Sequence, residues 1–316
     1  MLLRLVPSET SIRFMRWRKI GFAISALLIL GSIVLVGTRG LNLGIDFLGG
    51  TLIEVQTEGP ANLSAMRTEL NDLGLGEVTL QEFGAPDTVL IRIQRQAGEE
   101  EAQLAALEAA KAAIDEQVVE YRRQEFVGPT IGAELQEAAI YAVLSALVAI
   151  MIYIWFRFEW QFGLGAIVAL THDVIATMGL FALLQLEFNL STVAAVLTIA
   201  GYSINDTVVV YDRVREKIRK YKRMPFDELF DFALNKTLSR TVMTSVTTLL
   251  ALFALAFFGG EVIRGFSIAL IWGVVIGTYS SVMVAVPLLL YLRPKRGDEE
   301  IAPGEGSGSG PKAAKG

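Results

Sequence analysis

The stretch that decides the fold is L-S-T-V-A-A-V-L-T-I-A-G-Y-S-I-N-D-T-V-V-V-Y-D-R-V-R-E-K-I-R-K-Y-K-R, residues 190–223. Its first part is an apolar run long enough to cross a bilayer, yet it contains Asn205 and Asp206. A carboxylate inside the hydrocarbon costs about 2.5–3.5 kcal/mol on insertion scales. We therefore expect Asp206 to face protein or water and not lipid.

The end of the same stretch gives an orientation. Asp212 is followed by seven Lys and Arg residues between Arg213 and Arg223. Such a basic block is strongly disfavoured from crossing a membrane, so it predicts the cytoplasmic end of the span. Six residues of helix rise about 9 Å, which places Asp206 inside the hydrocarbon but in its cytoplasmic half.

The composition of the whole chain also indicates a membrane protein. Of its 316 residues, 53% are hydrophobic, and the mean hydropathy is +0.48. The formal net charge of −5 hides a segregation of basic residues to the predicted cytoplasmic segments. The chain has no cysteine and one histidine, which excludes disulfides, thiolate nucleophiles and Cys-based or multi-histidine metal centres. We expect neither a cofactor nor enzymatic activity.

Six apolar runs predict an all-α transmembrane bundle. The predicted spans are residues 20–37, 138–156, 162–184, 190–211, 241–258 and 266–292. The first run follows a basic segment, residues 1–19, and lacks a small-x-small cleavage site, so we interpret it as an uncleaved helix rather than a signal peptide. Six spans and the charge asymmetry predict a multi-pass membrane protein with both termini in the cytoplasm.

Residues 40–135 are polar enough to form a folded domain outside the membrane. Strand-like alternation occurs at residues 51–57, 78–83, 89–93 and 118–127, and helical spacing occurs at 61–73 and 99–117. The order β-α-β-β-α-β matches the ferredoxin-like split motif. This α+β domain outside the membrane has no phosphate loop, paired catalytic carboxylates or nucleic-acid-binding face, so we interpret it as a binding or docking module.

Two further segments lie on the predicted cytoplasmic side. In the connection 212–240, residues 224–239 place apolar side chains on one face, which favours a separate helix lying at the membrane interface. The chain after the last span, residues 293–316, is rich in Gly, Ser and Pro towards its end. That composition predicts a disordered tail.

Asp206, with Asn205, is the strongest candidate for proton coupling, because an ionisable group in a span needs a functional reason. The structural alternative is an interhelical hydrogen bond that holds the bundle together. Arg240 lies at the cytoplasmic mouth of the fifth span and is either a snorkelling residue or a partner of Asp206. The fourth span exits and the fifth enters on the same side, so the two side chains can pair if those helices are neighbours.

Two other motifs are candidates. His172 and Asp173 lie about 16 Å into the third span, where they are either a proton relay or a polar contact between helices. The sequence G-I-D-F-L-G-G follows the first span and contains Gly44, Asp46, Gly49 and Gly50. Glycines there suit tight turns, and the favoured interpretation is a structural motif that fixes the outer domain on the helix.

These motifs together resemble one known family. G-I-D-F-L-G-G, the H-D pair, G-Y-S-I-N-D-T-V-V-V-Y-D-R-V-R-E and N-K-T-L-S-R-T-V-M-T-S-V-T-T-L are similar to the SecD/SecF export-membrane proteins, from about residue 13 to 292. The layout also resembles half of an RND-type transporter. The resemblance implies a location in the bacterial inner membrane, with the α+β domain in the periplasm. It also implies use of the proton motive force and contacts with a SecD partner, the SecYEG channel, translocating unfolded preprotein and the lipid bilayer, with YajC and YidC as further neighbours. The transmembrane Asp and Arg of the family fall on Asp206 and Arg240.

Two other classes of membrane protein are alternatives to this interpretation. An intramembrane protease would need a G-x-G-D motif with a second aspartate, or G-x-S-x-G with a later histidine, and the motifs here match neither. A proton-coupled small-molecule efflux permease would use the same physics but normally carries both halves in one chain. An efflux subunit therefore remains the alternative to protein export.

Overall fold

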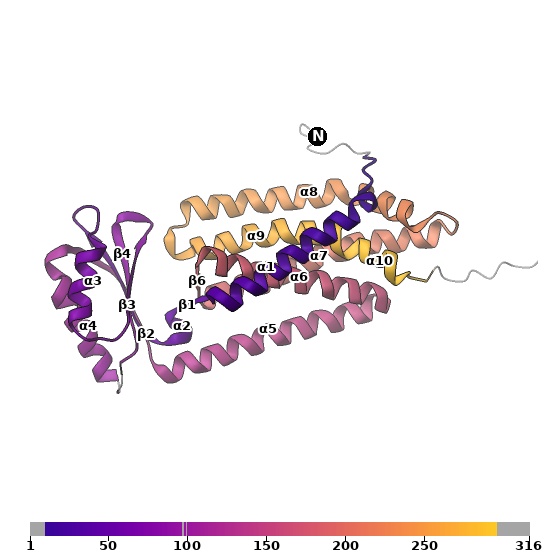
Figure 1. The fold of residues 1–316 in the computed structure, drawn as a ribbon. Helices are drawn as coiled ribbons and strands as arrows, with labels where there is room; N and C mark the ends of the chain where they lie inside the picture. Colours follow the sequence, from indigo (N-terminus) through magenta and orange to yellow (C-terminus); the bar gives the residue numbers. More distant parts are fainter. Residues whose placement is uncertain (1–9, 97, 99, 296–316) are drawn as a thin grey trace, which may run out of the picture.

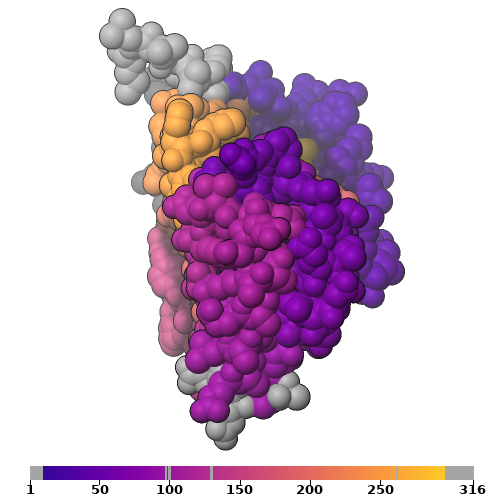
Figure 2. Space-filling view, turned by 90° about the vertical axis from the view of Figure 1, so that its left-hand side faces the viewer, coloured from indigo at the N-terminus to yellow at the C-terminus, as the bar shows by residue number. Residues whose placement is uncertain are grey.

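The computed structural model describes residues 10–96, 98 and 100–295. The fold is a bundle of long helices with a smaller α+β domain at one end (Figure 1). The N-terminal helix enters the bundle at the end farthest from the domain. Viewed from the domain side, the domain lies in front of the bundle (Figure 2). The predicted fold class is confirmed. The predicted tail falls on residues 293–316, of which 296–316 lie outside the described residues.

Within the described ranges, six helical segments are long and apolar enough to cross a membrane. The first five are α1 (Arg18–Arg39), α5 (Pro129–Arg157), α6 (Trp160–Leu184), α7 (Leu190–Lys220) and α8 (Phe226–Phe258), and a 3-10 turn, Phe14–Trp17, precedes α1. The sixth begins as α9 (Arg264–Ser280) and continues through the π-helix η4 (Ser281–Ala285) into α10 (Val286–Leu292). The number and order of the predicted spans are reproduced.

The end of the bundle opposite the domain has the largest apolar core. Phe162 of α6, Tyr211 of α7 and Phe230 of α8 are fully buried there, together with Met15 from the N-terminal segment. The rings of Phe162 and Tyr211 pack edge to face with centroids 5.1 Å apart. This core fixes α7 against α6 and α8 beyond the level of Asp206.

The connection between the fourth and fifth spans differs from the prediction of a separate interfacial helix. The structure has a single helix, α8, from Phe226 to Phe258. No Gly or Pro interrupts this sequence, so nothing ends the helix between its polar first part and the span. The apolar face that suggested an interfacial helix packs into the bundle core instead, where Leu229 and Phe230 are fully buried.

The outer domain has one four-stranded sheet in the order β3-β4-β2-β5, with every neighbouring pair antiparallel. Its elements are β2 (Gly50–Thr57), α3 (Leu63–Asp72), β3 (Val78–Phe83), β4 (Ala85–Ile93), α4 (Glu100–Ile114), the 3-10 turn Asp115–Gln117 and β5 (Val118–Val127). The two helices pack on one face of the sheet, and Leu70 and Ile114 bury their side chains against Ile53 and Ile91. This is the expected ferredoxin-like order.

Three short elements have no counterpart in the sequence prediction, two between the first span and the sheet and one between the third and fourth spans. β1 (Asn42–Leu43) pairs in parallel with β6 (Glu187–Phe188), the loop that joins α6 to α7, and α2 (Ile45–Leu48) follows β1. Two-residue strands have too few positions to show a periodic pattern. The β1–β6 pair joins the exit of the first span to the start of the fourth.

Candidate functional site

Asp206 lies at the meeting point of three helices in the bundle. Its Oδ1 accepts a hydrogen bond from Thr241 Oγ1 of α8 at 2.7 Å. Its Oδ2 accepts one from Ser281 Oγ of η4 at 2.5 Å. Only 9% of the residue surface is exposed. Asp206 therefore faces protein, as the cost of a carboxylate in lipid requires.

His172 and Asp173 form a second buried polar cluster on α6. Asp173 Oδ2 accepts hydrogen bonds from Ser203 Oγ of α7 at 2.5 Å and from Ser280 Oγ of α9 at 2.7 Å. His172 Nδ1 lies 2.9 Å from Asp173 Oδ1. Nε2 of the same imidazole is buried and has no hydrogen-bond partner among the described residues. Asp173 is thus the acceptor at the centre of a contact between α6, α7 and α9.

The two carboxylates belong to one polar layer. Ser203 and Asp206 are one turn apart on α7, so they lie on the same face. Ser280 and Ser281 are consecutive and mark the passage from α9 into the π-helix η4, a local widening that is frequent at functional sites. One serine contacts Asp173 and the next contacts Asp206. The two carboxylates are therefore connected through two consecutive residues of this short segment.

Arg240 and Asn205 are placed beside the cluster but do not bond to it. Thr241, not Arg240, turns towards Asp206, and no ion pair within 4.0 Å joins Arg240 to Asp206 in the described part of the chain. Successive helix residues point about 100° apart, which explains why only one of the two faces α7. The side chain of Asn205 is exposed on the outer surface of the bundle. Their roles in proton coupling stay predictions.

The hydroxyl partners of the carboxylates were not found from the sequence. A signal exists, because Ser203, Ser280 and Ser281 are polar positions in otherwise apolar spans. However, a serine or threonine in a helix can satisfy its hydroxyl on its own backbone. Thr247 does so, donating to the carbonyl of Met243 at 2.8 Å. Only the packing of the helices decides which hydroxyls reach across.

The glycine motif after the first span forms the joint between the outer domain and the bundle. Asp46 Oδ2 accepts a hydrogen bond from the backbone amide of Leu190, the first residue of α7, at 2.9 Å. A negative charge is favourable at this end of a helix. Gly44 lies so close to the α6–α7 loop that a Cβ there would stand 2.7 Å from Glu187 Oε1. The motif thus contacts the helix that carries Asp206.

The last glycines of the motif turn the chain into the sheet. Gly49 and Gly50 have φ angles of 71° and 115°, which residues with a side chain rarely adopt. A Cβ on Gly50 would also lie 2.6 Å from the carbonyl oxygen of Ile93. These contacts place the motif between the outer domain and the bundle, and its role as a structural motif stays a prediction.

A second contact at the joint comes from the sheet itself. Arg92 of β4 lies 3.3 Å from Glu187 of β6 and also donates to Asn42 Oδ1 at 3.2 Å and to the carbonyl of Leu43 at 3.1 Å. Burial raises the pKa of the Glu187 carboxyl above its ordinary value, and the positive charges of Arg92 and Arg123 offset part of that effect. The sheet is thereby attached to both strands of the β1–β6 pair.

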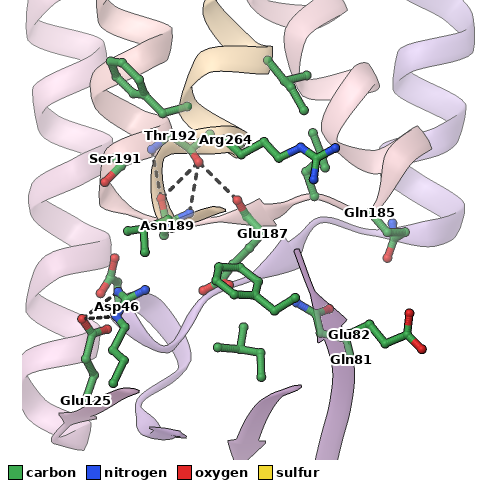
Figure 3. Close-up of a pocket in the computed structure, with 18 residues that line it drawn as sticks. Asp46, Gln81, Glu82, Glu125, Gln185, Glu187, Asn189, Ser191, Thr192 and Arg264 are labelled. Carbon is green, nitrogen blue, oxygen red and sulfur yellow. Dashed lines mark hydrogen bonds and ion pairs between the residues drawn. The ribbon is translucent and has the colours of Figure 1, made fainter. Parts of the chain in front are cut away.

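A cavity of about 440 Å³ lies beside this joint, between the outer sheet and the ends of the membrane helices. Figure 3 shows Asp46, Glu82, Glu125 and Glu187 around it, with Arg264 on the side of the bundle. No cluster of three or more possible metal-ligating side chains occurs among residues 10–96, 98 and 100–295. The cavity is lined by residues of the outer sheet, of the α6–α7 loop and of the ends of the membrane helices.

Comparison with known proteins gives consistent matches over most of the chain. Residues 106–295 match the family described as "Protein export membrane protein SecD/SecF, C-terminal", and residues 34–61 match the "SecD/SecF GG Motif". The protein translocase subunit SecF of Rickettsia felis is 44% identical over 302 residues, which cover 95% of this chain and 97% of the relative. That of Rhodobacter capsulatus is 45% identical, covering 96% of this chain and 95% of the relative.

A solved structure has the same arrangement of helices and domain. The crystal structure of SecDF, a translocon-associated membrane protein from Thermus thermophilus, superposes with a TM-score of 0.82 at 36% sequence identity. The match covers 92% of this chain but 40% of the SecDF chain. This chain therefore corresponds to less than half the length of that protein.

The fold and the buried polar layer define a multi-pass membrane transport protein with the architecture of half an RND-type transporter. The family matches and the relatives then identify it more closely. The chain belongs to the SecD/SecF protein-export family and corresponds to its SecF-type translocase subunits.

Proposed function

We propose that this chain uses the proton motive force, together with a SecD-type partner, to drive the completion of protein export across the bacterial inner membrane. The observation that carries the proposal is the Asp206 carboxylate, which is buried in the bundle and held by the neutral hydroxyls of Thr241 and Ser281. Neutral donors do not lock the carboxylate in its charged form as a direct ion pair would. Such a group can gain and lose a proton while it stays at the junction of three helices.

Protonation of Asp206 changes the contacts between α7, α8 and η4. A charged carboxylate accepts from both hydroxyls, whereas a neutral carboxyl group carries a proton that it must itself donate. The packing of the three helices then differs between the two states. A charge that moves through the full membrane potential gains about 2.3 kcal/mol per 100 mV, enough to bias a two-state bundle. His172 and Asp173 would carry the proton through the same polar layer, and Arg240 would supply positive charge at the end of the path.

The joint at the outer domain provides the route from the bundle to the preprotein. Asp46 contacts the first residue of α7, and Arg92 contacts the loop before it. A shift of α7 would therefore move the sheet directly. The outer domain would swing and pull or hold the emerging unfolded polypeptide at the periplasmic side.

A partner half is supported by the outer surface of α7. Asn205 is exposed there, on the same face as the exposed small residues Ala194, Thr198 and Gly201. An amide facing hydrocarbon is unfavourable, and small residues let a second helix approach closely. The likeness to part of the longer SecDF chain supports a SecD-type half as that neighbour. SecYEG, YajC and YidC are proposed as contacts of the complete assembly.

Orientation and export are supported by the charges and by the relatives. The seven basic residues after Asp212 favour a cytoplasmic position for that end of the bundle and for both termini. The names of the relatives favour protein export over the small-molecule efflux alternative and favour a transport component over an enzyme.

The proposal is tested with inverted inner-membrane vesicles that lack this chain. Adding it back should restore the completion of preprotein translocation, and collapsing the proton gradient with a protonophore should remove the restored part. Mild detergent extraction of the same vesicles should recover a SecD-type protein with the chain. Restoration that persists without a gradient would contradict proton coupling, whereas the absence of a copurifying partner would contradict the two-half assembly.

A further inference from the structure

A hollow at the end of the bundle opposite the outer domain has a charge arrangement to which the export proposal assigns no ligand. It lies between the last turn of α5 and the C-terminal part of α7, with a volume of about 440 Å³. Its lining residues are Arg157, Asp212, Arg215, Glu216, Arg219 and Lys220. Four cations and two carboxylates thus surround one space.

Both carboxylates of the hollow already have cationic partners. Asp212 accepts two hydrogen bonds from Arg157 Nη2, at 2.7 and 2.9 Å. Glu216 bonds to Arg213 on one oxygen and lies 3.4 Å from Lys217 Nζ on the other. These pairs use Arg157 within the hollow and two cations outside it. They leave the remaining cations of the hollow without a carboxylate.

In the described part of the chain, no carboxylate balances the charge of the three remaining cations in the hollow. Arg215, Arg219 and Lys220 form no ion pair with any described residue, although the Lys220 ammonium lies 5.7 Å from the ring centroid of Tyr221. Arg215 Nε is buried and has no hydrogen-bond partner within the described residues. Three cations around one space repel one another, so this site is suited to a ligand that brings oxygen acceptors and negative charge.

The surroundings of the hollow place it at the level of lipid headgroups. On α5, Trp155 and Phe156 come directly before Arg157 and are 66% and 87% exposed. Trp160, at the start of α6, is 55% exposed. Exposed aromatic side chains next to a change from apolar to charged residues are typical of the membrane–water interface. Only 6% of the apolar membrane-spanning stretch of α5 is buried against the rest of the chain.

We propose that this hollow binds the phosphate group of an anionic phospholipid. Arginine guanidinium groups match phosphate oxygens in a two-pronged geometry, and basic pockets between membrane helices favour anionic headgroups. The acyl chains would lie along the exposed aromatic end of α5. This flanking apolar surface favours a lipid over an acidic protein segment, which would need no such surface. The inference does not depend on proton coupling or on export.

The test measures lipid binding to the purified full chain in mild detergent, using short-chain phosphatidylglycerol and phosphatidylcholine as probes. The wild-type chain should bind phosphatidylglycerol at least tenfold more tightly than phosphatidylcholine. The Arg219→Gln/Lys220→Gln variant changes exposed side chains and should lose most of that preference. Arg215→Gln, which removes the unpartnered donor, should lose it as well. Unchanged elution and unfolding temperature would show that the variants remain folded.

The matched control removes the same charge elsewhere at the same end of the bundle. Arg16 and Lys19 are exposed near the start of α1, and Arg16→Gln/Lys19→Gln should keep the preference within about twofold. An equal loss in the control would show general electrostatic attraction and overturn the site. Full displacement of the lipid by millimolar inorganic phosphate would identify a free-anion site instead, and retention of the preference by both hollow variants would also overturn the proposal.

Discussion

Arg92 on the outer sheet and Glu187 in the α6–α7 loop are joined by an ion pair of 3.3 Å. The pair connects two parts of the chain that are far apart in sequence, the outer domain and the loop that leads into α7, the helix that carries Asp206. Together with the bond from the Leu190 amide to Asp46, it makes the start of α7 part of the domain joint. Motion of α7 and motion of the domain are therefore expected to be coupled.

The Glu187 carboxyl should make stability depend on pH. Burial raises its pKa in the folded protein above the ordinary value of 4.5, so the folded state holds this proton more tightly than the unfolded state. The stabilisation is fully present below the ordinary pKa and is lost as the pH rises through the raised value. Glu187→Gln has no proton to lose. The unfolding temperature of wild type relative to this variant should fall as the pH rises from 4 to 7.

The control for this titration is Glu82→Gln, because Glu82 lines the same cavity with an exposed side chain. Glu82→Gln retains Glu187, so its unfolding temperature relative to Glu187→Gln should still fall as the pH rises from 4 to 7. A wild-type advantage over Glu187→Gln that grows with pH would mean that the ion pair outweighs burial at this site.

Asp46 should protect the beginning of α7. Asp46→Ala removes the acceptor for the Leu190 amide, and loss of such a cap costs about 0.5–2 kcal/mol. Hydrogen exchange at the first turn of α7 should become faster in the alanine variant, while Asp46→Asn keeps an acceptor and should remain close to wild type. Equal exchange in all three proteins would remove Asp46 from the joint.

The hydrogen bonds from hydroxyl groups to Asp206 should stabilise the folded bundle more than ordinary hydrogen bonds between helices do. Ser281→Ala leaves a buried carboxylate oxygen without its donor, which costs about 1–3 kcal/mol. Ser245→Ala is the matched control, because its 2.7 Å partner, Thr278, is another hydroxyl and not a carboxylate. Denaturation in mixed detergent should show the larger loss for Ser281→Ala. A larger loss for Ser245→Ala would argue against a charged Asp206.

The orientation can be tested separately from the mechanism. A reporter fused at Gly98 should be active only in the periplasm, and one fused at Lys222 only in the cytoplasm, because the basic residues are concentrated at one end of the spans. The reverse result at either position would overturn the assigned orientation of the bundle.

The fold could be predicted from the sequence because the patterns that indicate it are local. The spans follow from apolar length and the outer sheet from alternation, and both depend only on neighbouring residues. The residues of the candidate site could be predicted only in part. Asp206 and Asp173 could be identified because a carboxylate in a span is rare. Their partners Thr241 and Ser280 could not, because which hydroxyl faces a carboxylate depends on how α8 and α9 are oriented about their axes in the folded bundle.

The differences from prediction have the same origin. Arg240 was expected to be able to pair with Asp206 because the depths agree, yet the next residue along the helix faces α7. The separate interfacial helix was inferred from an apolar face, but that face packs against the bundle core. Patterns along one helix show that a face will be buried and do not show which surface buries it.

The most direct test of the central claim compares Asp206→Asn with wild type in gradient-driven preprotein export, scored against the amount of partner complex recovered. The amide keeps the size and hydrogen-bonding capacity of the carboxyl group but cannot release a proton. Asp227→Asn is the control, since Asp227 is an exposed carboxylate at the start of α8. We predict that Asp206→Asn assembles normally and loses the gradient-dependent part of export, while the control retains it. Normal gradient-dependent export by Asp206→Asn would contradict proton coupling through this residue.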